Sequence, residues 1–385
     1  ARIWLHVIHT IYAQTEIYGN YSIFYLYICF SISNFYFYMT DIHKKQRIEY
    51  IDIAKGICII LVVYAHIDTT ILDYKIGIFF DSFRMPLYFF LSGLFFKQYS
   101  GIFEFTIKKI NNLIVPLFFF FIFSYLFDFI WAAINTLHGN NMLNNFKWQF
   151  WDPIRFGGGG SHNPPLWFLT CLFEINIIYY ILHKFLNFTL LNISIIIISV
   201  IGWYLAANGI VLPYKGTSAL VSLPFFHIGY LIRKSGFLTE NKHRDKYLFA
   251  SIIPISVFVY YIAQPVNIAG LHLPDHYWIF YTAGIGGTLS ILFLSKWIKH
   301  LPGIAYFGRY SLITFGTHWS IFTTAGALLY PLISESFTSY LLILLIVLAC
   351  EMVLIPIGIK YFPRFTAQQE LIPSDLLNKE KIKKQ

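Results

Sequence analysis

The sequence predicts an all-α protein that crosses a membrane about ten times. Hydrophobic residues make up 57% of the chain and charged residues only 12%, about half the charge of an ordinary soluble domain. The apolar residues are grouped in runs of about twenty, long enough to cross a bilayer as a helix. Lysine and arginine are distributed unevenly between alternate loops, as expected for a polytopic membrane protein.

Ten candidate spans can be placed from residue 47 onward. They cover approximately residues 49–67, 76–96, 112–134, 165–183, 189–207, 217–232, 247–263, 277–295, 308–330 and 339–361. With Lys44 on the cytoplasmic side, 21 of the 28 lysines and arginines lie on that side and five on the other. This asymmetry predicts that both ends are cytoplasmic if the chain starts at Met39. It also accounts for the net charge of +9 without nucleic-acid binding.

Residues 1–38 precede the first methionine and leave two interpretations open. Tyr21 to Tyr38 is apolar enough for an additional helix and lacks the features of a secretory signal. Alternatively, the segment is upstream sequence joined to the gene, because MTDIHKKQRIEY resembles a natural start. The expected organisation is a doubtful extension or extra helix at 1–38, a transmembrane domain at 47–362 and a cytoplasmic basic tail at 363–385.

One span carries three ionisable side chains on one face. It is RIEYIDIAKGICIILVVYAH, residues 47–66, with Asp52, Lys55 and His66. Eleven helical steps separate Lys55 from His66, about three turns plus 20° and roughly 16 Å along the axis. Asp52 lies about 40° from His66 on the same side. Ionisable groups inside a bilayer usually face a bundle interior or a pathway, so this stripe predicts a polar channel along the helix.

Each of these side chains has a plain and a functional interpretation. His66 either bonds a neighbouring helix at the interface or accepts a hydroxyl proton, because histidine titrates near working pH. Lys55 either extends to the membrane surface or pairs with Asp52, or it binds an anionic ligand. Trp148, Trp151 and Trp167 suit an interfacial aromatic belt or a sugar-stacking surface. The GGGGSHNPP segment between the last two is read as a flexible connector.

Residues 47–66 also resemble the first transmembrane helix of the acyltransferase 3 family of integral-membrane O-acyltransferases. The family signature is a basic residue, ten further residues and a histidine, which Lys55 and His66 match. SFRMPLYFFLSGLFF (Ser82 to Phe96) and PPLWFLTCLF (Pro164 to Phe173) resemble later helices. FFHIGYLIRK and GRYSLITFGTH resemble the C-terminal half, so the similarity covers about residues 47–362.

The resemblance implies a multi-pass O-acetyltransferase of the bacterial inner membrane. Acetyl-CoA would be the acyl donor, and the acceptor would be a hydroxyl of a cell-envelope or exported polysaccharide, free or lipid-linked. His66 would be the general base, with an acyl-histidine intermediate left open. Lys55, supported by Asp52, would bind the donor. No metal and no nucleic acid are expected.

Further candidates come from other spans. Arg84 either pairs with Asp81 or faces His66 and stabilises an oxyanion; Asp81 stands where the family sometimes has the first arginine of an Arg-x-x-Arg pair. Glu174 is a carboxylate within a span and hence a candidate for function, or a protonated group bonded to a backbone carbonyl. His227 and His318 are expected to be structural or to bind acceptor, with His318 inside the family-like GRYSLITFGTH. Glu174, Trp167 and His318 are thus expected to support or bind substrate.

Two other classes of membrane protein fit the composition. A transporter or flippase of lipid-linked sugar would be favoured by inverted repeats or paired broken helices, and none is visible. A glycan polymerase would be expected to carry more arginines in its outer loops than Arg155 alone. The absence of GxSxG argues against a serine hydrolase.

Overall fold

The structure is a computed structural model that describes residues 48–66, 74–99, 101–137, 142, 144, 146–239, 241–333 and 337–374. Contacts divide the chain into two units, Ala1–Arg47 and Ile48–Gln385, and every described residue belongs to the second unit. The described residues form helices and no strand, which confirms the all-α prediction. The possible extra helix within residues 1–38 and the end of the tail lie outside the described residues.

Every predicted span coincides with a long helix of the described chain. These helices are α3 (Glu49–His66), α4 (Tyr74–Leu94), α6 (Val115–Leu137), α8 (Trp167–Phe185), α9 (Phe188–Ala207), α10 (Gly216–Lys234), α11 (Lys242–Ile262), α12 (Tyr277–Ile298), α14 (Ser311–Leu329) and α15 (Phe337–Tyr361). The shorter helices are α5 (Ile102–Lys109), α7 (Asp152–Phe156), η4 (Pro164–Leu166) and α13 (Pro302–Arg309).

Six helices of the described chain are long and apolar enough to cross a membrane. They contain α6, α8, α9, α11, α12 and α15. The other four long helices carry too many charged or polar residues to be counted with these six; α3 carries Glu49, Asp52 and Lys55, for example, and α4 carries Asp81 and Arg84. The chain is therefore a multi-pass membrane protein, and the number of about ten spans stays a prediction.

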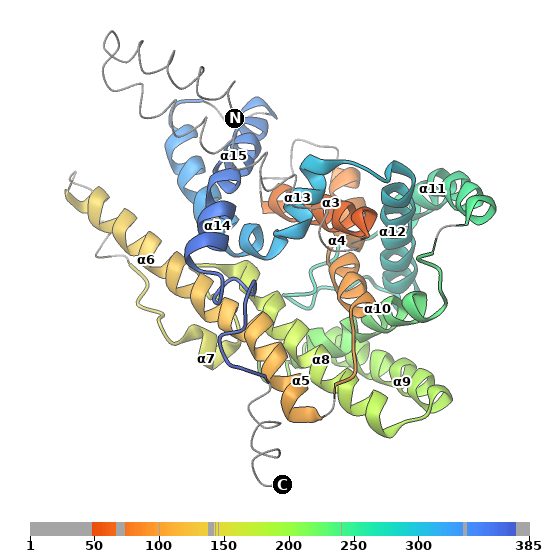
Figure 1. Ribbon diagram of the computed structural model, residues 1–385. Coiled ribbons are helices and arrows are strands. Elements are labelled where there is room, and N and C mark those ends of the chain that lie inside the picture. Colours follow the sequence, from red (N-terminus) through yellow and green to blue (C-terminus); the bar gives the residue numbers. More distant parts are fainter. Residues whose placement is uncertain are drawn as a thin grey trace, which may run out of the picture. The chain divides into compact units, whose positions relative to one another are not determined.

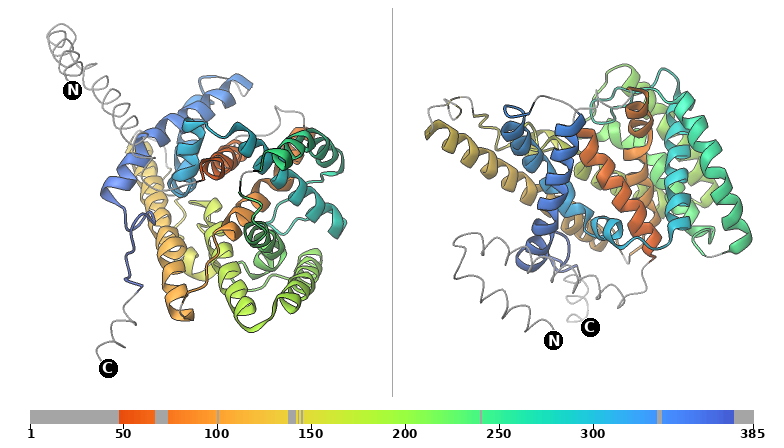
Figure 2. Two further views of the ribbon diagram at one scale, coloured as in Figure 1. Left: turned by 45° about the vertical axis from the view of Figure 1, so that its right-hand side comes forward. Right: turned by 90° about the horizontal axis from the view of Figure 1, so that it is seen from above.

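Two of these four helices, α3 and α4, lie among the other long helices. Figures 1 and 2 show α3 and α4 between α14 and α15 on one side and α11 and α12 on the other. α3 packs against α4, α12, α13 and α14, while α4 packs against α10 and α12. Surrounded in this way, α3 keeps its charged and imidazole side chains away from lipid.

Glycines bring the central helices into backbone contact. A Cβ added at Gly93 of α4 would overlap the carbonyl of Phe226 in α10, and one at Gly229 of α10 would overlap the carbonyl of Phe90. Gly308 of α13 meets the carbonyl of Asp52 in α3 in the same way. Small residues permit such close crossings in membranes, and these crossings fix α3 and α4 relative to their neighbours.

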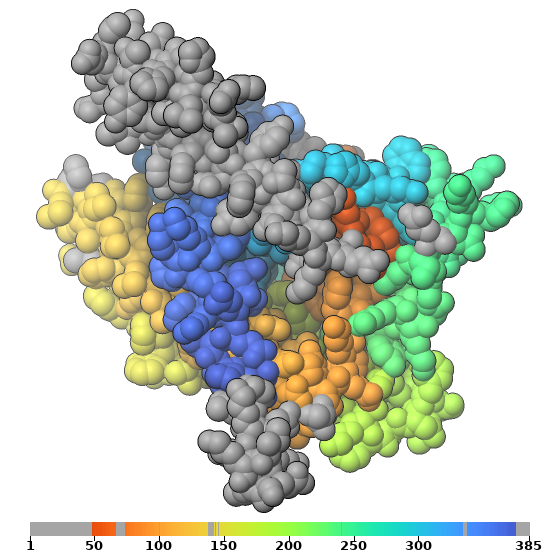
Figure 3. Space-filling model, viewed as in Figure 1, coloured from red at the N-terminus to blue at the C-terminus, as the bar shows by residue number. Residues whose placement is uncertain are grey.

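A π-helix, η2 (Ile110–Ile114), joins α5 to α6. Pro116 follows it and has no N–H to bond the preceding turn, which accounts for the widened turn. The side chain of Asn111 in η2 accepts hydrogen bonds from the backbone of Leu371 and Ile372 at 3.1 and 2.9 Å. It also donates to the carbonyl of Ile372 at 2.7 Å. The segment after α15 is thereby fastened beside α5 and α6 (Figure 3).

Candidate active site

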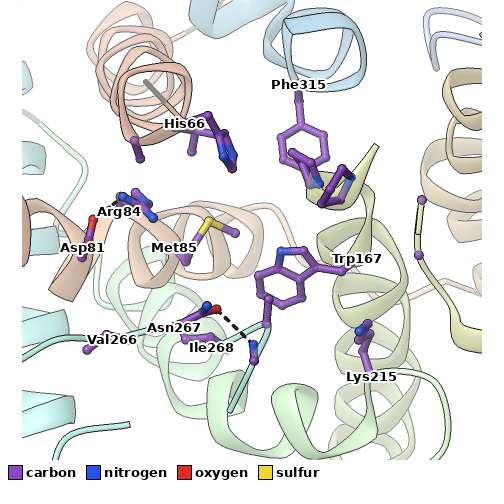
Figure 4. A pocket seen from close by; sticks show the side chains of 18 of the residues that line it. His66, Asp81, Arg84, Met85, Trp167, Lys215, Val266, Asn267, Ile268 and Phe315 are labelled. Carbon is purple, nitrogen blue, oxygen red and sulfur yellow. Dashed lines mark hydrogen bonds and ion pairs between the residues drawn. The ribbon is translucent and has the colours of Figure 1, made fainter. Parts of the chain in front are cut away.

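A cavity of about 590 Å³ lies at the C-terminal end of α3. We call it the His66 cavity. Its lining includes His66 from α3, Asp81, Arg84 and Met85 from α4, Trp167 from α8 and Phe315 from α14, together with residues of the loops at 158–160 and 266–270 (Figure 4). Four separate parts of the sequence thus supply imidazole, guanidinium, carboxylate and aromatic groups to one space.

The glycine-rich segment before α8 forms part of the cavity wall. The sequence predicts a flexible connector here, whereas the structure shows a turn in which Gly157 and Gly160 have left-handed φ values of 61° and 55°. Buried Asn163 fastens the turn by donating to Ser124 Oγ at 2.9 Å and to the carbonyl of Gly316 at 2.8 Å. These bonds tie the segment to α6 and α14.

Arg84 pairs with Asp81 and also lines the His66 cavity, and its role towards an oxyanion stays a prediction. Its guanidinium donates to the carboxylate of Asp81 one turn earlier. Both side chains also line the His66 cavity (Figure 4). The ion pair therefore holds a guanidinium in the same space as the imidazole of His66. A fixed cation at this place can stabilise negative charge that develops during a reaction.

His66 lies beside a second imidazole. The ring centroids of His66 and His318 are 5.4 Å apart, and Trp319 packs against His66 at 5.2 Å. His318 is fully buried, and its Nδ1 donates to the carbonyl of Thr314 at 2.9 Å. A neutral ring with hydrogen on Nδ1 carries a lone pair on Nε2. That Nε2 is buried and has no hydrogen-bond partner within the described residues.

Lys55 lines a different cavity, of about 330 Å³, which we call the Lys55 cavity. Lys109, Asn112 and Tyr88 also line it. The ammonium group of Lys55 lies 4.3 Å from the ring centroid of Phe95. The sequence predicts one polar channel along α3, but the structure places two cavities there, and Phe315 lines both. Asp52 is not part of the lining of either cavity.

Glu174 lies behind the His66 cavity rather than in its wall. Its Oε1 accepts from the backbone N–H of Lys215 at 3.4 Å, and Lys215 itself lines the cavity. His227 is not brought to this site: its ring nitrogens bond Tyr179 at 2.9 Å and Asn192 at 2.7 Å. The structure therefore gathers Trp167, Arg84 and His66 in one cavity and places His318 directly behind His66.

Three polar residues near these cavities do not stand out in the sequence: Lys109, Asn112 and Glu351. Glu351 of α15 is fully buried and accepts from Thr317 Oγ1 at 2.7 Å, next to His318 in the chain. A single carboxylate in an apolar span is the signal that marks Glu174, and it marks Glu351 equally. In the sequence Lys109 lies in a basic loop and Asn112 at the start of the predicted span 112–134, and only the fold places both side chains in the wall of the Lys55 cavity.

Comparison with known families matches residues 48–355 to the acyltransferase 3 family, whose description is "Acyltransferase domain". The match runs from the start of α3 into α15 and includes Lys55, His66 and Arg84. No curated protein and no solved structure matches. The match agrees with the resemblance seen in residues 47–66. Because it covers well over half of the chain, it shows the family. The chain is a membrane acyltransferase that belongs to the acyltransferase 3 family.

Proposed function

We propose that this membrane acyltransferase moves an acetyl group from acetyl-CoA to a hydroxyl of a cell-envelope or exported polysaccharide, in the bacterial inner membrane. The observation that carries the proposal is the position of Lys55 and His66 on one helix, facing two cavities that share Phe315. One cavity suits a donor and the other an acceptor, and the bond exchange takes place between them.

The donor occupies the Lys55 cavity. Two ammonium groups, those of Lys55 and Lys109, line it and attract the phosphates of a CoA donor. The eleven helical steps from Lys55 to His66 span roughly 16 Å, comparable to an extended pantetheine arm. A donor held by its phosphates near Lys55 can therefore present its thioester at Phe315, where the His66 cavity begins.

The acceptor occupies the His66 cavity. Its volume of about 590 Å³ and its mixture of Trp167, Arg84 and Asp81 with loop backbone suit a sugar. His66 takes the proton from the attacking hydroxyl as its oxygen bonds to the thioester carbonyl carbon. The resulting oxyanion is stabilised by Arg84. The carbon–sulfur bond then breaks, and His66 returns the proton to the thiolate of CoA.

His318 sets the orientation of His66 in this scheme. Its Nε2 has no hydrogen-bond partner within the described residues, and the centroid of the His66 ring lies 5.4 Å from that of His318. We propose that in the reacting enzyme this Nε2 accepts a hydrogen bond from one ring N–H of His66. The other nitrogen of His66 then carries the lone pair that a base requires, directed to the cavity. His318 is a positioning residue and does not touch the substrate.

The test is transfer of label from [14C]acetyl-CoA to polysaccharide in membranes that contain the chain. His66→Ala should lower incorporation by about 10³-fold, because the base is removed. His300→Ala is the matched control, since His300 is 73% exposed and bonds only surface Glu49 in the described chain. It should keep wild-type incorporation at equal protein level.

Two results would contradict the proposal. Undiminished incorporation of label by His66→Ala would show that His66 is not the general base. Consumption of acetyl-CoA by the wild-type chain without label in any hydroxyl-containing product would remove the acceptor class.

A further inference from the structure

A third cavity, of about 400 Å³, lies between α6, α14 and the segment before α8. We call it the Asp128 cavity. Asp128 and Trp131 of α6 line one side, and Trp319, Thr323 and Thr324 of α14 line the other. The proposed reaction uses none of these side chains.

The Asp128 cavity adjoins the His66 cavity. Gly160 lines the His66 cavity, and the next residue, Ser161, lines the Asp128 cavity. On the opposite side, Trp319 lines the Asp128 cavity while its ring packs against His66 at 5.2 Å between centroids. A ligand that extends beyond the His66 cavity at this edge meets the Asp128 cavity next.

The lining has the chemistry of a carbohydrate site. Two tryptophan side chains from facing helices supply large flat apolar surfaces for the C–H faces of a pyranose ring. The hydroxyls of Ser161, Thr323 and Thr324 and the carboxylate of Asp128 supply hydrogen-bond partners for sugar hydroxyls. A few polar groups among aromatic walls are typical of sites for small polar ligands.

The carboxylate of Asp128 is held in place by His162. The Nδ1 of His162 bonds Asp128 Oδ2 at 2.8 Å, and its Nε2 bonds the carbonyl of Lys147 at 2.8 Å. Carboxylate and carbonyl oxygens only accept, so these two contacts favour the imidazolium form of His162, in which both ring nitrogens donate. It has no lone pair left to act as a base. It orients Asp128 and links α6 to the backbone at Lys147.

We propose that the Asp128 cavity binds a sugar residue of the acceptor adjacent to the residue that is acylated. This inference rests on the proposed function. The acceptor chain runs from the His66 cavity past Gly160 and Trp319 into the Asp128 cavity. The enzyme accordingly recognises at least two consecutive sugars and prefers an oligomer to a single sugar.

The test measures acceptor binding without any donor. Purified chain in nanodiscs is dialysed against tritiated tetrasaccharide fragments of the host's surface polysaccharide, and separately against the single sugars. Trp131→Ala should raise the Kd of the tetrasaccharide about tenfold and leave that of the single sugar unchanged. Trp131→Phe keeps an aromatic face and should raise the Kd of the tetrasaccharide by less than Trp131→Ala does. Trp278→Ala, at an exposed tryptophan of α12, is the matched control and should bind as the wild type does.

The inference is overturned if Trp131→Ala and the wild type bind the tetrasaccharide with the same Kd. It is also overturned if Trp131→Ala and the control Trp278→Ala raise that Kd equally. A cavity that holds a lipid tail would show no saturable tetrasaccharide binding, which also overturns it. Because no acetyl-CoA is present, a failure of acetyl transfer in the wild type would refute the proposed function and leave this binding result standing.

Discussion

The imidazole of His66 lies beside a second imidazole, that of His318. His318 is buried, bonded through Nδ1 to Thr314, and directed by its ring toward His66. Helical periodicity alone placed Lys55 and His66 on one face, because both belong to the same helix. The neighbour of His66 comes from α14, some 250 positions further along, and no local pattern in the sequence encodes that pairing.

We predict that His318→Ala lowers kcat about 10²-fold without changing KM for either substrate. Loss of the acceptor nitrogen leaves His66 free to expose the wrong ring nitrogen, but removes no contact to substrate. His318→Gln, which keeps an acceptor oxygen, should recover part of the rate. His183→Ala, at a histidine that bonds Gln98 and Tyr230, is the control. A rise in KM with constant kcat would show that His318 binds substrate instead.

His162 gives a prediction about pH. Burial alone would lower the pKa of His162, but the hydrogen bonds to Asp128 and to the carbonyl of Lys147 outweigh it, and Asp152 of α7 adds to them, so the pKa is raised above 6.5. A group with a raised folded-state pKa stabilises the fold below its unfolded pKa, and this contribution is lost as pH rises through the folded pKa.

The melting temperature of the wild type should therefore exceed that of His162→Gln at pH 6, and the difference should shrink at pH values above about 6.5. Thermal unfolding in detergent between pH 5.5 and 9 measures it. A difference that is constant over this range would show that His162 is neutral in the folded chain.

At the level of the elements, the positions of the ten long helices followed from runs of about twenty apolar residues, and the structure has a helix at each. The short α13 and the π-helix η2 did not follow from such runs. α13 has only eight residues, so it gives no apolar run of about twenty. η2 depends on Pro116 and on the distant segment that Asn111 binds. Both are consequences of packing.

The close crossing of α4 and α10 should be sensitive to one added methyl group. Gly229→Ala would place a Cβ against the carbonyl of Phe90, so the helices must separate. We expect a loss of about 1–3 kcal/mol in the free energy of unfolding. Gly303→Ala is the control, because a Cβ there meets nothing within 4 Å. Unfolding of both variants in a denaturing detergent compares them, and equal stability would mean that α4 and α10 pack less closely than the structure shows.

At the scale of the whole molecule, the division of one polar face into two cavities is the feature that sequence could not provide. The partition depends on Phe315, and the second cation of the Lys55 cavity depends on Lys109. These residues come from helices far apart in the chain. Which helices meet is decided by the packing of all of them, so the cavities appear only when the fold is complete.

The Lys55 cavity predicts different roles for two adjacent lysines. Lys109 lines the cavity, whereas Lys108 pairs with Glu104 at 3.4 Å and lies over the Tyr99 ring. Lys109→Ala should raise KM for acetyl-CoA about tenfold with little change in kcat, because a charged contact to the donor is lost. Lys108→Ala should leave both parameters unchanged. Steady-state release of CoA measures both variants, and equal effects would mean that the donor lies elsewhere.

The uninterrupted helix between Lys55 and His66 imposes a constraint on chain length. Removing one residue anywhere between them would rotate His66 by about 100° and draw it about 1.5 Å closer along the axis. The imidazole of His66 would then leave the His66 cavity and would also lose its contact with the ring of His318. The number of residues between Lys55 and His66 is therefore fixed by geometry, because an insertion or deletion of one residue cannot be accommodated while both ends keep their places.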